Sequence, residues 1–174
     1  MKRTRFLTHA ALFAALICML SPLAIPVGTV PVTLASFALL LTGLLLDWRR
    51  AGAAVGLYLL LGIVGLPVFS GGQAGFGVLL GPTGGYLWSY LPMVLLVSRY
   101  RGKKMPQALM ACGGAMLMCY ACGTWQFVHV SGSEIGAALT ACVLPFIPFD
   151  VLKLLAACAL GMKLRARLQA AGLL

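Results

Sequence analysis

Six apolar stretches follow one another along the chain, separated by short basic segments or by segments rich in proline and glycine. They cover roughly residues 6–25, 32–47, 51–68, 83–98, 106–128 and 136–162. Because a membrane-spanning helix needs about 20 apolar residues, the pattern predicts six transmembrane helices, the second and third short enough to require tilt or partial insertion. We expect residues 1–174 to form a single six-helix membrane domain with no room for a soluble catalytic domain.

The composition supports an integral membrane protein. Of the 174 residues, 61% are hydrophobic and 9% are charged, and the mean hydropathy is +1.01. Such a chain has too little polar surface to cover a water-soluble globule. Its basic and then apolar start imitates a signal peptide, but no small-residue cleavage site leads into a polar mature domain. We therefore predict an all-α membrane protein whose first apolar stretch is a transmembrane helix.

The basic residues mark one side of the predicted helices. Twelve of the 13 lysines and arginines lie before the first stretch or after the second, fourth and sixth. The other loops, near residues 26–31, 68–82 and 129–135, contain none. Since basic loops stay in the cytoplasm, both termini are predicted to be cytoplasmic. The net charge of +10 then indicates orientation and contact with anionic membrane lipid, and no nucleic-acid partner is expected.

The thirteenth basic residue, Lys153, lies with Asp150 inside the sixth apolar stretch, in LPFIPFDVLKLLAA (144–157). Each charge at the centre of a membrane helix costs about 2.5–3.5 kcal/mol, so we expect an interaction that offsets this cost. Residues three apart share one helix face, and Pro145 and Pro148 loosen the helix just before the pair. Ionisable residues within a membrane indicate a functional site, so the pair predicts a ligand site in the outer half or middle of the membrane; a private salt bridge is the alternative.

Two of the outer loops are rich in glycine and proline. One is IPVGTVPVT (25–33), and the other is GLPVFSGGQAGFGVLLGPTGGY (65–86), which contains eight glycines. Glycine allows the backbone to approach a ligand closely, and irregular backbone near a membrane is tolerated where it lines a cavity. The second loop is therefore interpreted either as the wall of a binding site or as a plain re-entrant turn.

Other site chemistries find little support in the sequence. Gly102-Lys103 lacks the first glycine of a P-loop, which excludes ATP hydrolysis by that route. Cys119 and Cys122 form a CxxC with no second pair and no suitably placed histidine, so no metal site is predicted. The six cysteines are interpreted as small buried side chains.

Small residues recur in the first stretch, HAALFAALICM. Ala10 and Ala14 are four residues apart, as are Ala11 and Ala15. Small residues at this spacing let another helix approach closely in a membrane. The pattern alone leaves two interpretations open, packing within this chain and docking of a partner subunit.

Four stretches occur in order along the chain, namely GLPVFSGG, LLGPTGGY (79–86), YACGTW (120–125) and PFIPFDVLK (145–153). Together they resemble the signatures of the BioY family, the biotin-binding S components of energy-coupling factor (ECF) transporters, and the likeness follows nearly the whole chain. The resemblance implies the six-helix S-component fold in a bacterial plasma membrane and capture of extracellular biotin. It also implies a transmembrane T subunit and two cytoplasmic ATPase subunits as partners; these use the ATP, and the chain itself needs no cofactor.

The resemblance also implies roles for particular residues. Asp150 and Lys153 match the pair that holds the biotin head group. The residues that match the region closing over the ligand are Tyr86, Gly71, Gly72 and Gly84. Gln73 stands where a small residue is more usual, and it is a further candidate for a polar contact. Trp125 is interpreted either as an apolar wall of the site or as a core or interfacial tryptophan. The small-residue face on which S components meet the T subunit is matched by Ala10, Ala11, Ala14 and Ala15.

The chemistry of biotin suits the pair. Its ureido ring offers two N–H donors, which a carboxylate accepts, and one C=O acceptor, to which an ammonium donates. A second pose, in which Lys153 meets the valerate carboxylate, stays open. Two other functions compete: an S component for a different vitamin, and an intramembrane enzyme using Asp150 and Lys153 as an acid–base pair. An enzyme would need a nucleophile or metal near the pair, and none is evident.

Overall fold

The computed structural model describes residues 2–25 and 31–172, and most of them are helical. The helices are α1 (Lys2–Leu20), α2 (Ala35–Leu45), α3 (Trp48–Val64), α4 (Phe76–Leu80), α5 (Gly84–Arg99), α6 (Met105–Ser131), α7 (Ile135–Cys142) and α8 (Ile147–Ala170). A 3-10 turn, η1 (Ser70–Gly72), precedes α4, and the antiparallel strands β1 (Ala24–Ile25) and β2 (Val32–Thr33) lie between α1 and α2. The all-α prediction is confirmed. Most of the outer loop predicted at 26–31 lies outside the described residues.

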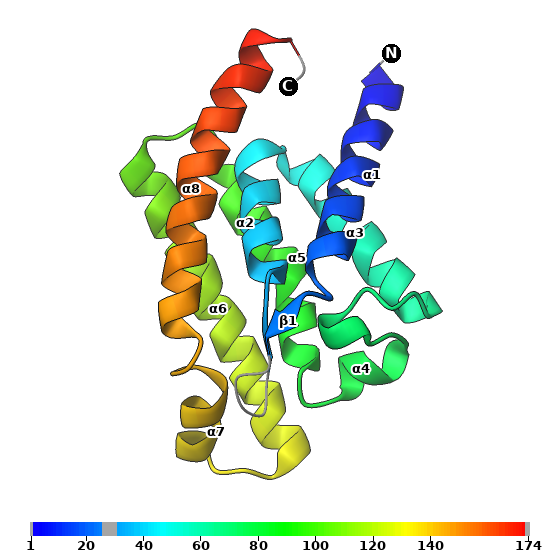
Figure 1. The fold of residues 1–174 in the computed structure, drawn as a ribbon, viewed down its shortest axis with the longest axis vertical. Helices are drawn as coiled ribbons and strands as arrows, with labels where there is room; N and C mark the ends of the chain where they lie inside the picture. The colour runs from blue at the N-terminus through cyan, green and yellow to red at the C-terminus, as the bar shows by residue number, and fades with distance from the viewer. Residues whose placement is uncertain (1, 26–30, 173–174) are drawn as a thin grey trace.

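The helices form a bundle with α2 near its centre. α2 packs against α8 and α5 and also contacts α1, α3 and α6. α6 and α8 lie on one side of it and α1 and α3 on the other, as Figure 1 shows. Both chain ends lie at the same end of the bundle, whereas α4 and α7 lie towards the opposite end (Figure 1). The predicted placement of both termini in the cytoplasm needs this common end, and the side of the membrane that it faces stays a prediction.

The helices differ in their capacity to cross a membrane. Within the described residues, Arg3–Leu20 and Met105–Ser131 are long and apolar enough, and α7 with α8 adds a third if the pair forms one span. By contrast, α2 has 11 residues. At 1.5 Å per residue such a helix is roughly 16 Å long, against about 30 Å for the hydrocarbon core of a bilayer. Protein surrounds α2 and buries nine of its residues, so lipid need not match its length. The count of six spans stays a prediction.

The sixth apolar stretch is not the single helix that the sequence predicted. It forms α7 and α8, which are bent by 52° at the break between them. Pro145 lies in the break, and Pro148 lies in the first turn of α8. Proline has no N–H to donate and its ring clashes with the preceding turn, so a helix cannot continue through this segment. As a result α8 begins at Ile147, and Asp150 lies in its first turn.

Phe69 anchors the glycine-rich segment to the bundle. Its side chain is fully buried and packs edge-on against Tyr58, with ring centroids 5.7 Å apart. The ring also lies against Gly62 of α3, where any Cβ would collide with it. Tyr58 Oη is hydrogen-bonded to Ser21 Oγ at 2.7 Å, which joins α3 to the end of α1. These contacts hold the residue that follows, Ser70, at a defined position on the bundle.

The LLGPTGGY segment (79–86), whose last three residues begin α5, packs closely against α6. A Cβ at Gly84 would collide with the Leu79 carbonyl and with the side chain of Gln126. Gln126 of α6 donates to two backbone carbonyls of this segment, each at 2.8 Å. Gly123 of α6 leaves space for the ring of Tyr86, which any Cβ there would strike. Close helix packing, which small residues permit, therefore explains these glycines and sets the direction of Tyr86.

Candidate ligand-binding site

A cavity lies among α2, α5, α6, α8 and the glycine-rich segment. It holds about 740 Å³ of space free of protein atoms, part of which is open to solvent. The wall is mostly apolar and aromatic, with contributions from Val32, Phe69, Val78, Tyr86, Leu87, Tyr90, Met93, Met116 and Phe146. Small-molecule sites in proteins have this character, an apolar wall with a few polar groups that fix the orientation of the ligand.

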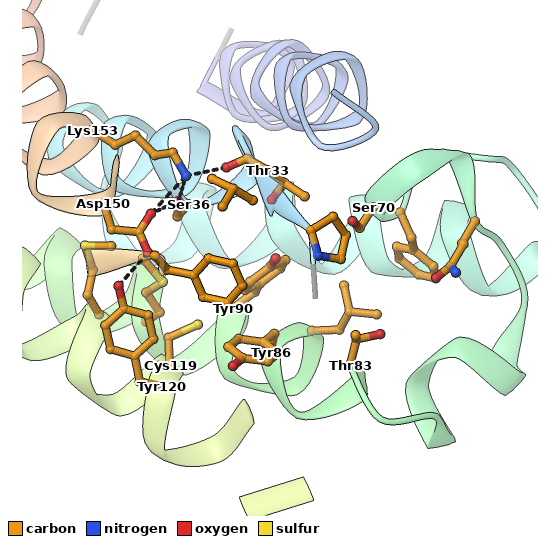
Figure 2. Close-up of a pocket in the computed structure, with 18 of the residues that line it drawn as sticks. Thr33, Ser36, Ser70, Thr83, Tyr86, Tyr90, Cys119, Tyr120, Asp150 and Lys153 are labelled. Carbon is orange, nitrogen blue, oxygen red and sulfur yellow. Dashed lines mark hydrogen bonds and ion pairs between the residues drawn. The ribbon is translucent and has the colours of Figure 1, made fainter. Parts of the chain in front are cut away.

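Asp150 and Lys153 form an ion pair at one side of this cavity. Lys153 Nζ lies 2.9 Å from Asp150 Oδ1, and each side chain is 11% exposed. The ammonium also donates to the backbone carbonyl of Thr33 at 2.6 Å and lies 3.5 Å from Ser36 Oγ (Figure 2). The prediction that the two charges lie on one helix face is confirmed by this contact, and their joint role in holding a ligand stays a prediction.

The carboxylate of Asp150 has further partners on two other helices. Tyr120 of α6 donates to Oδ2 at 2.6 Å, and Ser36, in the first turn of α2, donates to Oδ1 at 3.3 Å. The N-terminus of α8 also favours a negative charge in its first turn, by about 0.3–1 kcal/mol. The expected cost of two buried charges is thus offset by mutual pairing and by hydrogen bonds to both oxygens.

The opposite side of the cavity presents neutral polar groups. Figure 2 shows Ser70 and Thr83 across the cavity from Asp150 and Lys153, and Gln73 also lines it. Within the described residues, the buried Oγ of Ser70 has no hydrogen-bond partner. Leaving a buried hydroxyl unpaired costs about 1–3 kcal/mol, so this atom favours a ligand that bonds to it. The cavity therefore suits a small molecule with polar groups at both ends and an apolar middle.

Four of the seven residues predicted to bind the ligand line the cavity, namely Asp150, Lys153, Tyr86 and Gln73. The three predicted glycines do not line it. Gly71 and Gly72 have φ angles of +65° and +79° in the turn η1, a conformation that glycine adopts without strain, so the turn explains them. Gly84 is explained by its packing against Leu79 and α6.

Of two further residues that the sequence singled out, one lies outside the cavity and the other lines it. Trp125 is 64% exposed and packs against His129 instead of lining this cavity. Cys119, in contrast, is buried and lines the cavity, and Ser89 donates to its sulfur at 3.0 Å. Among the described residues, no group of three or more histidine, cysteine, aspartate or glutamate side chains gathers in a way that could hold a metal ion.

Sequence reasoning missed the partners of the ion pair. Tyr120 lies in the stretch YACGTW, but nothing in that stretch indicates that its hydroxyl meets Asp150. Ser36 lies 114 residues from Asp150 in the sequence, and the Thr33 carbonyl is a backbone group that no side-chain pattern could reveal. Only packing of α2, α6 and α8 against one another brings these groups together.

The two alanine pairs of α1 lie on different faces. Ala10 and Ala14 are 6% and 1% exposed, buried within this chain, whereas Ala11 and Ala15 are exposed. Successive residues of an α-helix are about 100° apart, so adjacent pairs cannot share one face. The prediction that Ala10 and Ala14 form part of a docking surface is wrong, because α1 uses that face to pack within the bundle. Ala11 and Ala15 remain candidates for docking.

An apolar helical bundle around a cavity with a charged anchor defines a membrane protein that binds a small solute. The chain belongs to the BioY family, whose model matches residues 1–170. It is 40% identical over 162 residues to the biotin transporter BioY2 of Lactococcus lactis subsp. cremoris, covering 91% of this chain and 88% of that protein. It is 36% identical over 166 residues to the biotin transporter BioY of Thermotoga maritima, covering 92% and 96%.

A solved structure agrees with this family assignment. The crystal structure of the S-component for biotin from an ECF-type ABC transporter matches with a TM-score of 0.88 at 27% identity. The match covers 95% of this chain and 93% of the other. The resemblance noted in the sequence is thereby confirmed, and so is the S-component fold.

Proposed function

We propose that this chain captures biotin from outside the cell and is the S component of an ATP-driven ECF importer. The observation that carries the proposal is the Asp150–Lys153 pair at one side of a largely apolar cavity. The carboxylate can accept from the ureido N–H groups, and the ammonium can donate to the ureido carbonyl. The thiophane ring and valeryl chain suit the aromatic and aliphatic wall. Among ligands with this chemistry, biotin is the one that the relatives are named as transporting.

For the pose, we propose that the ureido ring faces the ion pair and the valerate carboxylate points towards Ser70, Gln73 and Thr83. A ligand carboxylate beside Lys153 would also lie near the carboxylate of Asp150, and two like charges repel each other. The unpaired Ser70 hydroxyl supports a hydrogen-bonding group at the opposite side. Biotin methyl ester tests the pose. If the carboxylate paired with Lys153, esterification would weaken binding to the parent but not to a Lys153→Met variant.

We further propose that a transmembrane T subunit and two cytoplasmic ATPase subunits work with this chain in the bacterial plasma membrane. Those partners use the ATP, and the S component needs no cofactor of its own. The exposed Ala11 and Ala15 of α1 are the candidate surface for the T subunit, since small side chains allow a second helix to approach closely. The shared end of the two termini, with its basic residues, is the proposed cytoplasmic end.

The competing functions have less support. The relatives are named as transporters, which disfavours an intramembrane enzyme that uses the ion pair for acid–base chemistry. An S component for another vitamin would need a ligand that offers the same donors and acceptor to the pair. Biotin is the ligand named for the relatives at 40% and 36% identity.

Binding of radiolabelled biotin to the purified, monodisperse chain in detergent tests the proposal. We expect saturable binding that unlabelled biotin displaces and that riboflavin and thiamine do not. Saturable binding of another vitamin with no binding of biotin would overturn the biotin assignment. Uptake into vesicles that hold the chain with and without the T subunit and ATPases then tests the transport step separately from capture.

A further inference from the structure

A second hollow, an open groove, lies at the end of the bundle that holds both chain ends. It is lined by α1, by the first turn of α3 with the preceding Asp47, and by the end of α5. Its lining includes four arginines and two large aromatic side chains, namely Arg49, Arg50, Arg99, Arg101, Phe6 and Trp48. The ligand cavity described above shares none of these residues.

Among the described residues, most of the positive charge of this groove has no carboxylate partner. Its carboxylate, Asp47, caps α3 by accepting from the backbone N–H groups of Arg49 and Arg50, each at 3.1 Å. Asp47 also pairs with Arg50 Nε at 3.2 Å. Within the described residues, no carboxylate pairs with the side chains of Arg49, Arg99 or Arg101.

The other acidic residues of the chain cannot supply the missing charge. The sequence has three acidic residues in all. Besides Asp47 these are Glu134, which precedes α7 towards the other end of the bundle, and Asp150, which is engaged by Lys153. Among the residues that the structure describes, three guanidinium groups therefore face one groove without an anion. Guanidinium groups form bidentate hydrogen bonds with phosphate, which makes a phosphate-bearing anion the matching ligand.

Apolar groups beside the arginines favour a lipid as the source of that phosphate. Trp48 is 55% exposed, and the Arg49 guanidinium lies 5.1 Å from the centre of its ring. Tryptophan concentrates at the level of lipid headgroups, where its ring is in contact with both apolar and polar surroundings. Leu7 on α1 and Leu60 on α3 are 58% and 59% exposed, so the two helices that contribute to the groove also carry exposed apolar side chains. A soluble phosphate ion has no apolar part that could pack against such side chains.

We propose that this groove binds the phosphate headgroup of an anionic phospholipid, with Arg49, Arg99 and Arg101 contacting the phosphate. Trp48 lies at the glycerol level of that lipid, and the acyl chains run along the exposed leucines of α1 and α3. The bound lipid fixes the depth and tilt of this end of the bundle in the membrane. The inference is independent of the ligand in the other cavity, and it holds whether or not that ligand is biotin.

Quenching of Trp48 fluorescence by brominated lipids tests the proposal. The chain has three tryptophans, so a Trp88→Phe/Trp125→Phe background leaves Trp48 as the reporter. The full chain is placed in nanodiscs that contain the same fraction of brominated phosphatidylglycerol or brominated phosphatidylcholine. From the quenching we expect a relative affinity for phosphatidylglycerol at least about five-fold higher than for phosphatidylcholine. This is the effect of a single favourable charge contact of roughly 1 kcal/mol.

Charge variants then show which residues cause the preference for phosphatidylglycerol. The triple variant Arg49→Gln/Arg99→Gln/Arg101→Gln should abolish the preference for phosphatidylglycerol. If the triple variant folds poorly, Arg99→Gln alone replaces it as the test, since Arg99 is exposed, and it should reduce the preference. The matched control is Lys104→Gln/Lys163→Gln/Arg167→Gln. It removes three exposed charges that do not line this groove, and it should keep the preference. Size-exclusion chromatography and thermal unfolding report whether each variant is folded.

Three results would overturn the proposal. One is a preference for phosphatidylglycerol that survives in the folded triple variant. Another is loss of the preference on adding inorganic phosphate but not chloride at equal ionic strength, which would assign the groove to a soluble phosphate. The third is an unchanged lipid preference combined with lost co-purification of partner subunits in the triple variant, which would make the groove a protein-docking surface.

Discussion

The Asp150–Lys153 pair is tested by removing each charge separately and then both together. In Asp150→Asn, the ammonium of Lys153 keeps only neutral partners, the Thr33 carbonyl at 2.6 Å and the Ser36 hydroxyl at 3.5 Å. In Lys153→Met, the carboxylate keeps the hydroxyls of Tyr120 and Ser36. Each single variant thus leaves a nearly buried charge without its counter-ion and also removes a group that the ureido ring would contact.

The expected magnitude follows from that arrangement. Truncating one partner of a buried, hydrogen-bonded charge pair costs about 2–5 kcal/mol in binding. This corresponds to a roughly 30-fold to 4,000-fold weaker affinity for biotin, since each 1.4 kcal/mol is about a factor of ten. The double variant leaves neither charge unpaired. Its loss should therefore be smaller than the sum of the single losses, by about 0.5–3 kcal/mol for groups in direct contact.

Calorimetric titration of biotin into the detergent-purified parent, both single variants and the double variant measures these losses. Lys163→Met, at an exposed lysine of the same helix, and Glu134→Gln control for charge removal in general, and neither should change the affinity. Size-exclusion chromatography confirms that each variant is monodisperse. If a folded double variant binds biotin like the parent, the ligand site is elsewhere and the reasoning from the ion pair is wrong.

Three other predictions follow from the same structure. Tyr120→Phe removes the 2.6 Å hydrogen bond to Asp150, which should lower the free energy of unfolding by about 1.5–3 kcal/mol and, through the loosened carboxylate, weaken biotin binding in a titration. Unchanged affinity in a folded variant would show that this bond does not orient the carboxylate. Ala14→Leu places a larger side chain at a buried position and should lower both thermal stability and biotin binding. The matched Ala15→Leu, at an exposed position, should keep both and instead reduce co-purification of the T subunit. Equal behaviour of the two variants would contradict the assignment of the buried and exposed faces of α1. In a cysteine-free chain, a cysteine at the exposed Ser131 should react with an impermeant reagent on intact cells, and reaction only after the cells are opened would invert the predicted topology.

The sequence determined the class of the protein and the central pair of its site. Mean hydropathy and the spacing of apolar stretches are sums over neighbouring residues, so they indicate a helical membrane protein without knowledge of packing. The i, i+3 spacing of Asp150 and Lys153 likewise depends only on the geometry of one helix, and their contact at 2.9 Å agrees with it. Both predictions concern distances along one segment, which local geometry sets.

The tertiary structure decided which groups meet the pair and which faces are free. Tyr120 and Ser36 reach Asp150 from helices 30 and 114 residues away, and their directions depend on how α2, α6 and α8 pack. The same is true of α1, where an identical four-residue spacing gives one buried alanine pair and one exposed pair, because only one face of the helix meets the bundle. A periodic pattern shows that residues share a face, and only the neighbouring helices decide whether that face is covered.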